Sequence, residues 1–157
     1  SKFIWPGSEA QWNGLSDVTD AKVLAKQLIW ASTTEAAKNE AYNVTNGDIF
    51  RWKWLWQKIA DHFNIEAEGF DKSIRPLENV LNGKEQVWKS IAERYELKEA
   101  DLSKLSSAWH TDLDLGRPIE VMTDMSKSRK AGFTVFESTE DSFLNLFEKL
   151  RLEKIIP

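Results

Sequence analysis

The feature that most constrains the fold is a strand–turn–helix pattern near the start of the second third of the chain. Residues 41–45 are typical of a short strand, Asn46-Gly47 of a tight turn, and the tryptophan-rich residues 49–63 of an amphipathic helix. A strand that passes directly into a helix is the unit of a parallel α/β sheet. One parallel strand cannot form a sheet alone, and most of the remaining chain has helical periodicity. The pattern therefore predicts an α/β fragment, mostly α, that belongs to a larger protein.

Composition narrows the classes of protein. A chain of 157 residues is long enough for one domain with a core. No apolar run approaches the ~20 residues of a membrane-spanning helix, and no signal peptide opens the chain. A net charge of −4 argues against nucleic acid as a partner. The absence of cysteine and of an export signal favours a cytoplasmic protein, and the absence of an initial Met favours a fragment.

Two helices surround the predicted strand. The first is expected from about Asp20 to Ala31, and Asp48 is placed to cap the second, over 49–63. Trp54 is expected to point away from the buried stripe of the second helix. The expected inward positions are Val23, Leu24, Gln27, Leu28 and Ala31 in the first helix, and Trp52, Leu55, Trp56, Ile59 and Phe63 in the second.

The second half of the chain is expected to be helical with one interruption. Helices are predicted over 73–81, 83–95, 101–106 and 123–130, and Ser138-Thr139-Glu140-Asp141 is a capping box for a last helix. Residues 107–118 have no clean period and end in helix breakers, which predicts a loop. Aperiodic polar and aromatic loops of this length often bind ligands.

Few residues in the chain carry recognisable chemistry. No glycine-rich nucleotide-binding or nucleophile motif occurs, so no catalytic, cofactor-binding or metal residue is assigned. His110, Asp112 and Asp114 would share one face of a strand and could bind a metal ion. The alternative, which we favour, is that they form loop hydrogen bonds and helix caps. Neither tyrosine is followed by a lysine four residues later, so the chain lacks a Tyr/Lys pair.

Two segments are candidates for ligand binding. Trp109 and His110 could close over an apolar ligand, or Trp109 could anchor its loop to the core. The polar run Ser16-Asp17-Val18-Thr19-Asp20 precedes a helix, so it could cap that helix or contact a ligand.

Several of these segments resemble one protein family. The chain is similar to the C-terminal part of the progesterone 5β-reductase/iridoid synthase-like proteins, a branch of the extended short-chain dehydrogenase/reductases within the epimerase/dehydratase superfamily. The matching residues, in order, are Trp5-Pro6-Gly7, Ser16-Asp17 with Asp20, residues 37–48, Trp52 to Trp56, Gly83-Lys84-Glu85 with Val87-Trp88, Met125-Ser126-Lys127-Ser128 with Gly132-Phe133, and Ile155-Ile156-Pro157. The block at 39–48 is the most specific of them.

The resemblance implies a fold and an activity. Residues 1–157 would form the C-terminal substrate-binding lobe, and residues 41–45 the last strand of a Rossmann-type sheet. The NAD(P)-binding domain would precede this sequence. The whole protein would use NADPH to reduce the activated C=C bond of a small apolar enone or enal, with an upstream tyrosine stabilising the enolate oxygen. This chain alone would be inactive.

The resemblance also implies substrate-binding residues. Ser16 matches a pocket residue of the family, and residues 105–117 match a mobile segment that closes over the substrate. Trp109 and His110 match an aromatic pair, in which His110 replaces a phenylalanine. This replacement makes the pocket more polar and argues against steroid-like substrates.

Two other functions and one association state remain open. The chain could be a non-enzymatic α-helical module that binds a ligand or a partner helix, or the lobe of a sugar-type epimerase or dehydratase, because the absent half would set the chemistry. An isolated parallel strand has two unpaired edges, so we also expect the chain to self-associate or to stay only marginally soluble. Its expected partners are its own N-terminal domain or a second copy.

Overall fold

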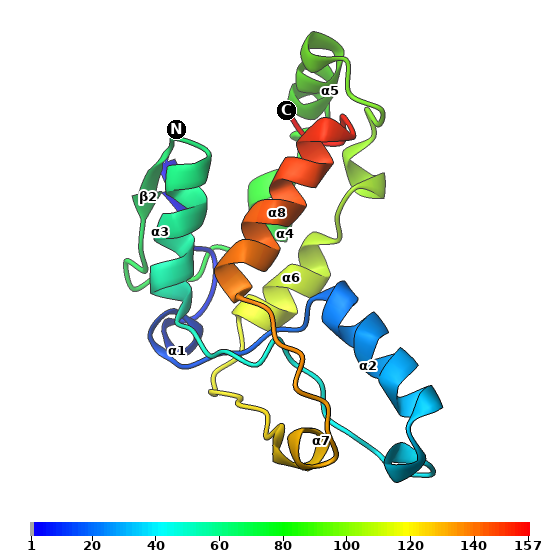
Figure 1. The fold of residues 1–157 in the computed structure, drawn as a ribbon. Helices are drawn as coiled ribbons and strands as arrows, with labels where there is room; N and C mark the ends of the chain where they lie inside the picture. Colours follow the sequence, from blue (N-terminus) through cyan, green and yellow to red (C-terminus); the bar gives the residue numbers. More distant parts are fainter. Residues whose placement is uncertain (1) are drawn as a thin grey trace.

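The computed structural model describes residues 2–157, and within them the chain is mostly helical (Figure 1). This confirms the predicted α-rich α/β class. The strands are β1 (Lys2–Ile4) and β2 (Glu66–Glu68). The α-helices are α1 (Glu9–Asn13), α2 (Ala21–Thr33), α3 (Trp52–His62), α4 (Leu77–Leu81), α5 (Glu85–Tyr95), α6 (Ala108–Leu115), α7 (Ser126–Lys130) and α8 (Thr139–Leu152); η1 (Glu35–Ala37) and η2 (Leu102–Lys104) are single 3₁₀ turns.

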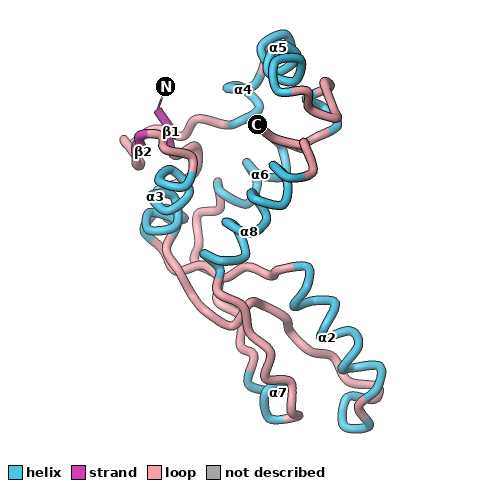
Figure 2. The backbone as a smooth tube through the Cα atoms, turned by 45° about the horizontal axis from the view of Figure 1, so that its top comes forward, coloured by secondary structure: helices cyan, strands magenta, loops and turns pink. Residues whose placement is uncertain are grey.

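The helices form a central body from which two helices, α2 and α7, project; we call these two helices the arms. In Figures 1 and 2, α3 lies beside the strands, α8 and α6 occupy the middle, and α2 and α7 project downward. Helix α3 packs on both β2 and α8, and α4 packs on α6. A small core of Val23, Met125 and Phe133 joins the two arms. The candidate site lies where the arms leave the body.

The two strands form a parallel pair that the sequence did not predict. Phe3 lies opposite Ala67. The Phe3 ring stacks on Trp56 of α3, with ring centroids 3.7 Å apart, and the Trp56 indole donates a hydrogen bond of 2.9 Å to the Phe3 carbonyl. The strands are three residues long and carry little apolar patterning, which explains why periodicity missed them.

The strand predicted at 41–45 is not present. Side chains hold this segment: Gln27 donates to the Asn43 carbonyl at 2.8 Å, and Thr19 donates to the Val44 carbonyl at 2.9 Å. Among the described residues, the amides of 41–45 donate to no other backbone group. A strand needs a neighbouring strand for its ladder, and none lies beside this segment in the described part of the chain.

The predicted stripe of α3 is largely confirmed. Leu55, Trp56 and Ile59 are buried, and Trp54 is 43% exposed, as its position on the opposite face requires.

The prediction for α2 was partly wrong. Val23 and Gln27 are buried, but Leu24 and Leu28 are 41% and 62% exposed because α2 packs on the chain along only one narrow face.

Asp48 has a different role from the one predicted. Helix α3 begins at Trp52, with Arg51 as its N-cap residue. The Asp48 carboxylate instead accepts hydrogen bonds from the amide and hydroxyl of Thr139, at 2.8 and 2.6 Å, and so binds the start of α8. The capping box of α8 is confirmed in part, since Ser138 accepts from the Asp141 amide at 3.3 Å.

The segment predicted as a loop at 107–118 contains helix α6. Its inward positions are Ala108, Asp112 and Leu115, at helical spacing. The Asp112 carboxylate accepts hydrogen bonds from the amides of Leu77 and Glu78 in the first turn of α4, at 2.7 and 3.0 Å. Because one inward position is an aspartate, the apolar period that would have predicted the helix is absent.

Replacing Asp48 tests its contact with α8. Asp48→Ala leaves the amide and hydroxyl of the fully buried Thr139 without their acceptor, which we expect to lower the free energy of unfolding by about 2 kcal/mol. Urea unfolding followed by circular dichroism measures the change. Asp61→Ala, which removes only an exposed contact with Gln57, is the control. A loss no larger than that of the control would contradict the assignment.

Candidate functional site

Ser16 lies on the wall of a small cavity where the arms leave the body. The cavity has a volume of about 110 Å³ and is lined by Ser16, Val18, Trp52, Arg117 and their neighbours. Ser16 is buried, and its amide and carbonyl form a two-way bridge with Phe50, at 2.9 and 3.0 Å. Among residues 2–157, the hydrogen bond of the Ser16 hydroxyl is a long one, 3.4 Å, which it donates to the Gln11 side-chain oxygen. The backbone is thus fixed while the hydroxyl can still bind a polar group of a ligand.

Side-chain hydrogen bonds hold residues 117–123 in place, and part of this segment lines the small cavity. Ser8 donates to the Arg117 carbonyl at 2.6 Å, and Gln11 donates to the Ile119 carbonyl at 2.6 Å. Farther along, the Thr123 amide donates to the Asp17 carboxylate at 2.6 Å. These contacts join residues about 100 positions apart in the sequence, so sequence patterns could not reveal that Gln11 and Arg117 line the Ser16 cavity.

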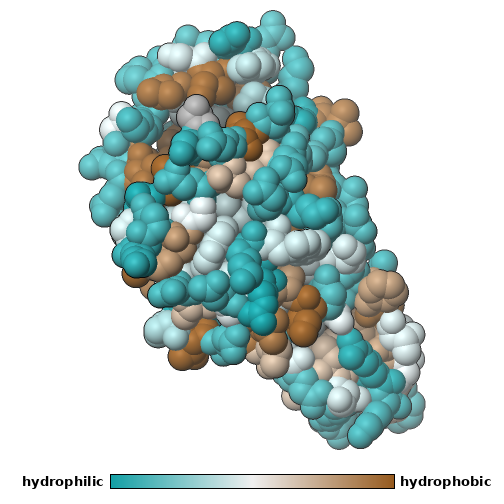
Figure 3. Space-filling view, turned by 90° about the vertical axis from the view of Figure 1, so that its left-hand side faces the viewer, coloured by the Kyte–Doolittle hydropathy of each residue, from teal (hydrophilic) through white to brown (hydrophobic). Residues whose placement is uncertain are grey.

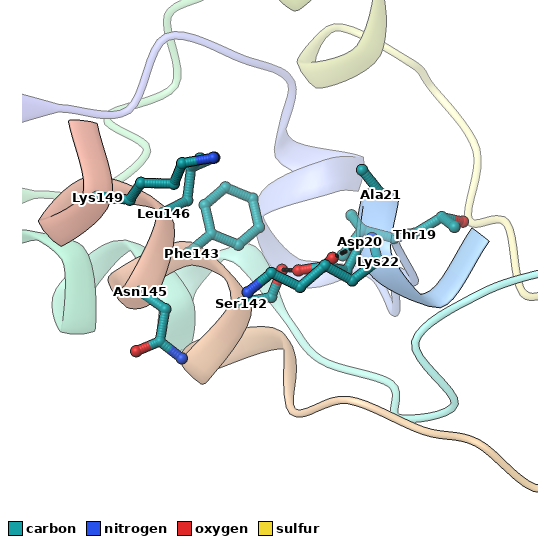
Figure 4. A pocket seen from close by; sticks show the side chains of 10 residues that line it. Thr19, Asp20, Ala21, Lys22, Ser142, Phe143, Asn145, Leu146 and Lys149 are labelled. Atoms are coloured by element: carbon teal, nitrogen blue, oxygen red, sulfur yellow. Dashed lines mark hydrogen bonds between the residues drawn. The ribbon is translucent and has the colours of Figure 1, made fainter. Parts of the chain in front are cut away.

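A larger cavity of about 470 Å³ lies between the start of α2 and α8 (Figure 4). Val18 lines both cavities. Trp52 of the smaller cavity meets Phe143 of the larger one edge to face, with ring centroids 6.0 Å apart. Val18 and this aromatic pair therefore lie between the two cavities.

Asp20 connects the two walls of the larger cavity. Its carboxylate caps α2 by accepting from the Lys22 amide at 2.6 Å, and it accepts from the Ser142 hydroxyl of α8 at 2.6 Å (Figure 4). The Ser142 hydrogen bond, followed by that from the Lys22 amide, lowers the pKa of Asp20 below its ordinary value. The capping interpretation of the 16–20 run is thus confirmed for Asp20.

Trp109 and His110 do not lie in either of these cavities. Both are exposed on α6, Trp109 by 50%. Their rings contact each other at 4.3 Å between centroids, and His110 Nδ1 lies 2.8 Å from the Ser107 hydroxyl. The half-exposed indole does not anchor a loop in the core. The structure therefore does not bring this pair to Ser16, and its role in substrate binding stays a prediction.

The His110-x-Asp112-x-Asp114 run lies in helix α6 and not in a strand, and its side chains make hydrogen bonds and a helix cap. His110 contacts Ser107, Asp112 binds the first turn of α4, and Asp114 pairs with Arg117. Over residues 2–157 no group of three or more histidine, aspartate and glutamate side chains has the arrangement of a metal site.

Comparisons with known proteins agree on one family. The family model described as a PRISE-like Rossmann-fold domain matches residues 1–157. Similar curated proteins include a 3-oxo-Delta(4,5)-steroid 5-beta-reductase of Arabidopsis thaliana, 38% identical over 100% of this chain and 40% of the relative. An (S)-8-oxocitronellyl enol synthase of Antirrhinum majus is 36% identical over 99% of this chain and 40% of the relative. The chain thus spans about 40% of the length of these relatives.

The Asp20–Ser142 contact predicts a pH-dependent stability. Because the folded chain lowers the Asp20 pKa, the contact stabilises the fold above about pH 4 and loses this effect as the pH falls through the folded pKa. Ser142→Ala should raise the Asp20 pKa and lower the unfolding free energy at pH 7 by roughly 0.5–1 kcal/mol, with a smaller difference at pH 3.

Carboxyl NMR titration and urea unfolding at both pH values measure these changes. Ser90→Ala, which removes an exposed hydrogen bond within α5, is the matched control. An Asp20 carboxyl that titrates at the same pH in wild type and Ser142→Ala would show that the contact does not control its pKa.

Proposed function

Because the chain belongs to the family of PRISE-like Rossmann-fold domains, we propose that it is the C-terminal, substrate-binding part of an NAD(P)H-dependent reductase. Its substrates would be small apolar enones or enals, reduced at the activated C=C bond. The observation that carries the proposal is that nearly the whole of this chain matches relatives named as a steroid 5-beta-reductase and as 8-oxocitronellyl enol synthases. These names favour a reductase over a sugar epimerase or a binding module.

The residues of this chain do not fit the cofactor by themselves. The seven glycines form no phosphate-binding loop, and the Tyr42 hydroxyl donates to the Ala36 carbonyl at 3.1 Å. The cofactor, which supplies a hydride, and the tyrosine that would stabilise the enolate are therefore assigned to sequence before residue 1. We assign no catalytic residue to this chain and expect it to be inactive alone.

The contribution of this chain would be to hold the substrate. By exchanging its long hydrogen bond to Gln11, the Ser16 hydroxyl can donate to a substrate oxygen while Val18 and Trp52 contact the apolar part of the substrate. A volume of about 110 Å³ is well below the ~300 Å³ of typical ligand pockets. The preceding domain would therefore form the rest of the pocket, and Trp109 and His110 would contact the substrate only in that assembly.

Two surfaces of the chain support docking to such a domain. The backbone amides of 41–45 donate to no other described backbone group, as an edge awaiting a strand would. Helix α2 exposes Leu24, Leu28 and Ile29, the last two by more than 60%, and exposed apolar stripes of this kind mark interfaces. We propose that the NAD(P)-binding domain pairs with 41–45 and covers α2.

Association and location remain proposals. The self-association expected from the unpaired segment 41–45 stays a proposal, and a second copy of the chain could also cover α2. Figure 3 shows that the face on the left of Figure 1 carries separate apolar patches among hydrophilic residues. None of the helices over 2–157 has the length and apolar character to cross a bilayer. We propose a cytoplasmic location because the chain contains no cysteine.

Cofactor binding tests the proposal that the preceding domain binds NAD(P)H and this chain binds the substrate. Titrating the 157-residue chain with NADPH should give no saturable quenching of tryptophan fluorescence up to about millimolar cofactor, because no phosphate-binding loop is present. A longer protein that includes the preceding sequence should bind NADPH saturably and oxidise it with an enone, followed by absorbance. Saturable micromolar binding to the short chain would contradict the proposal.

The role of Ser16 can be tested in the longer protein. Ser16→Ala removes one hydrogen bond to the substrate, so kcat/KM for an enone should fall about five- to tenfold, while the affinity for NADPH stays unchanged. Ser90→Ala, at an exposed serine of α5 whose hydroxyl donates to the Gln86 carbonyl, is the control. An unchanged kcat/KM in Ser16→Ala would exclude Ser16 from substrate recognition.

A further inference from the structure

The larger cavity, at about 470 Å³, has the size of a ligand site and is not explained by the proposed reductase function. Its one wall is the start of α2, with Thr19 to Lys22, and its other wall is one face of α8 (Figure 4). The Ser142 hydroxyl of α8 donates a hydrogen bond of 2.6 Å to the Asp20 carboxylate, which joins the two walls. The folded chain therefore fixes the two walls of the cavity relative to each other.

The α8 wall of the cavity carries apolar side chains, which form its floor. In Figure 4 the Phe143 ring and Leu146 lie next to each other on α8. The Phe143 ring also contacts Trp52 and Phe147, at 6.0 and 6.2 Å between ring centroids. Leu146 is 49% exposed. A concave apolar surface open to water gains free energy when an apolar chain covers it.

The rim of the cavity carries more positive than negative charge. The lining residues include two lysines, Lys22 and Lys149, and one carboxylate, Asp20. Both Asp20 oxygens already accept hydrogen bonds. Among the described residues Lys149 has only Glu153 as an ionic partner, at 3.8 Å, and both side chains are largely exposed, so this pair is weak. In Figure 4 the two lysine side chains lie on either side of the Phe143 ring.

We propose that this cavity binds an amphiphilic monocarboxylate. The hydrocarbon part would lie on Phe143 and Leu146, and the carboxylate would be bound by the ammonium groups of Lys22 and Lys149. This site is separated from the Ser16 cavity by Val18 and the Trp52–Phe143 pair. The proposal concerns only residues of this chain and is independent of the proposed reductase function.

The test compares octanoate with 1-octanol, which has the same hydrocarbon length but no charge. Each is titrated into the 157-residue chain and followed by ¹H–¹⁵N NMR. Octanoate should shift the amides of 18–22 and 142–149 and bind about tenfold more tightly than octanol. In the double variant Lys22→Gln/Lys149→Gln, the two ligands should bind equally, because the difference arises from the two ion pairs.

Two further variants separate the site from general surface binding. Leu146→Asp places a charge on the exposed edge of the apolar floor and should abolish binding of both ligands without unfolding α8. Leu152→Asp on the same helix, at a position that is 84% exposed and outside the cavity, and Lys130→Gln on α7 should leave binding unchanged. Equal affinities for the two ligands in the wild type, or shifts outside 18–22 and 142–149, would overturn the proposal.

Discussion

The buried amide of Asn46 is the contact on which the arrangement of both cavities depends. Asn46 is fully buried, and its backbone amide donates to the Val18 carbonyl at 2.8 Å while its side-chain oxygen accepts from the Asp20 amide at 2.5 Å. Its side-chain amide donates to the Thr139 hydroxyl at 3.3 Å, and its carbonyl accepts from Glu137 at 2.8 Å. One residue therefore joins the segment before α2 to the segment before α8. Since a buried polar group left without partners is costly, this residue fixes both segments in one arrangement.

The position of the larger cavity follows from this junction. Residues 18–22 and the first turns of α8 are its two walls, and Asn46 and Asp48 together determine where both begin. The Asp20–Ser142 hydrogen bond then adds a direct connection between the walls. Polar groups thus determine how the two walls are placed, whereas the apolar residues Phe50, Leu55 and Ile59 form a hydrophobic core. Hydrophobic burial stabilises such an arrangement but is non-directional, so the geometry of the cavity has to come from the hydrogen bonds.

The sequence patterns correctly predicted those features of the structure that depend on contacts between residues close together in the sequence. The stripe of α3 and the cap of α8 at Ser138 depend on residues three or four positions apart, and both were found. Asp48 was assigned to the nearest helix, but its true partner, Thr139, lies about 90 positions away. Helix α6 was missed because its inward Asp112 is satisfied by α4 rather than by its own neighbours. Residues 41–45 have strand composition, but a strand requires a partner strand and the described chain offers none at this place. Of the candidate site, Ser16 was found through the family resemblance, whereas Gln11, Trp52 and Arg117 join it only through the fold.

The helical state of α6 changes how Trp109 and His110 can reach a substrate. In a loop, each side chain could move independently, but here both belong to one helix. The amides of Leu77 and Glu78 in the first turn of α4 donate two hydrogen bonds to the Asp112 carboxylate of this helix. The C-terminal end of α6 is held by Leu115, which is buried against Trp5 and Trp56. A movement that brings the aromatic pair toward Ser16 must therefore break the Asp112 contacts, leaving two amides of α4 without acceptors, or move α4 and α6 together. The second route preserves the two hydrogen bonds between the helices, so a movement of Trp109 and His110 toward Ser16 would be a rigid-body movement of this helix pair about its attachment at Leu115.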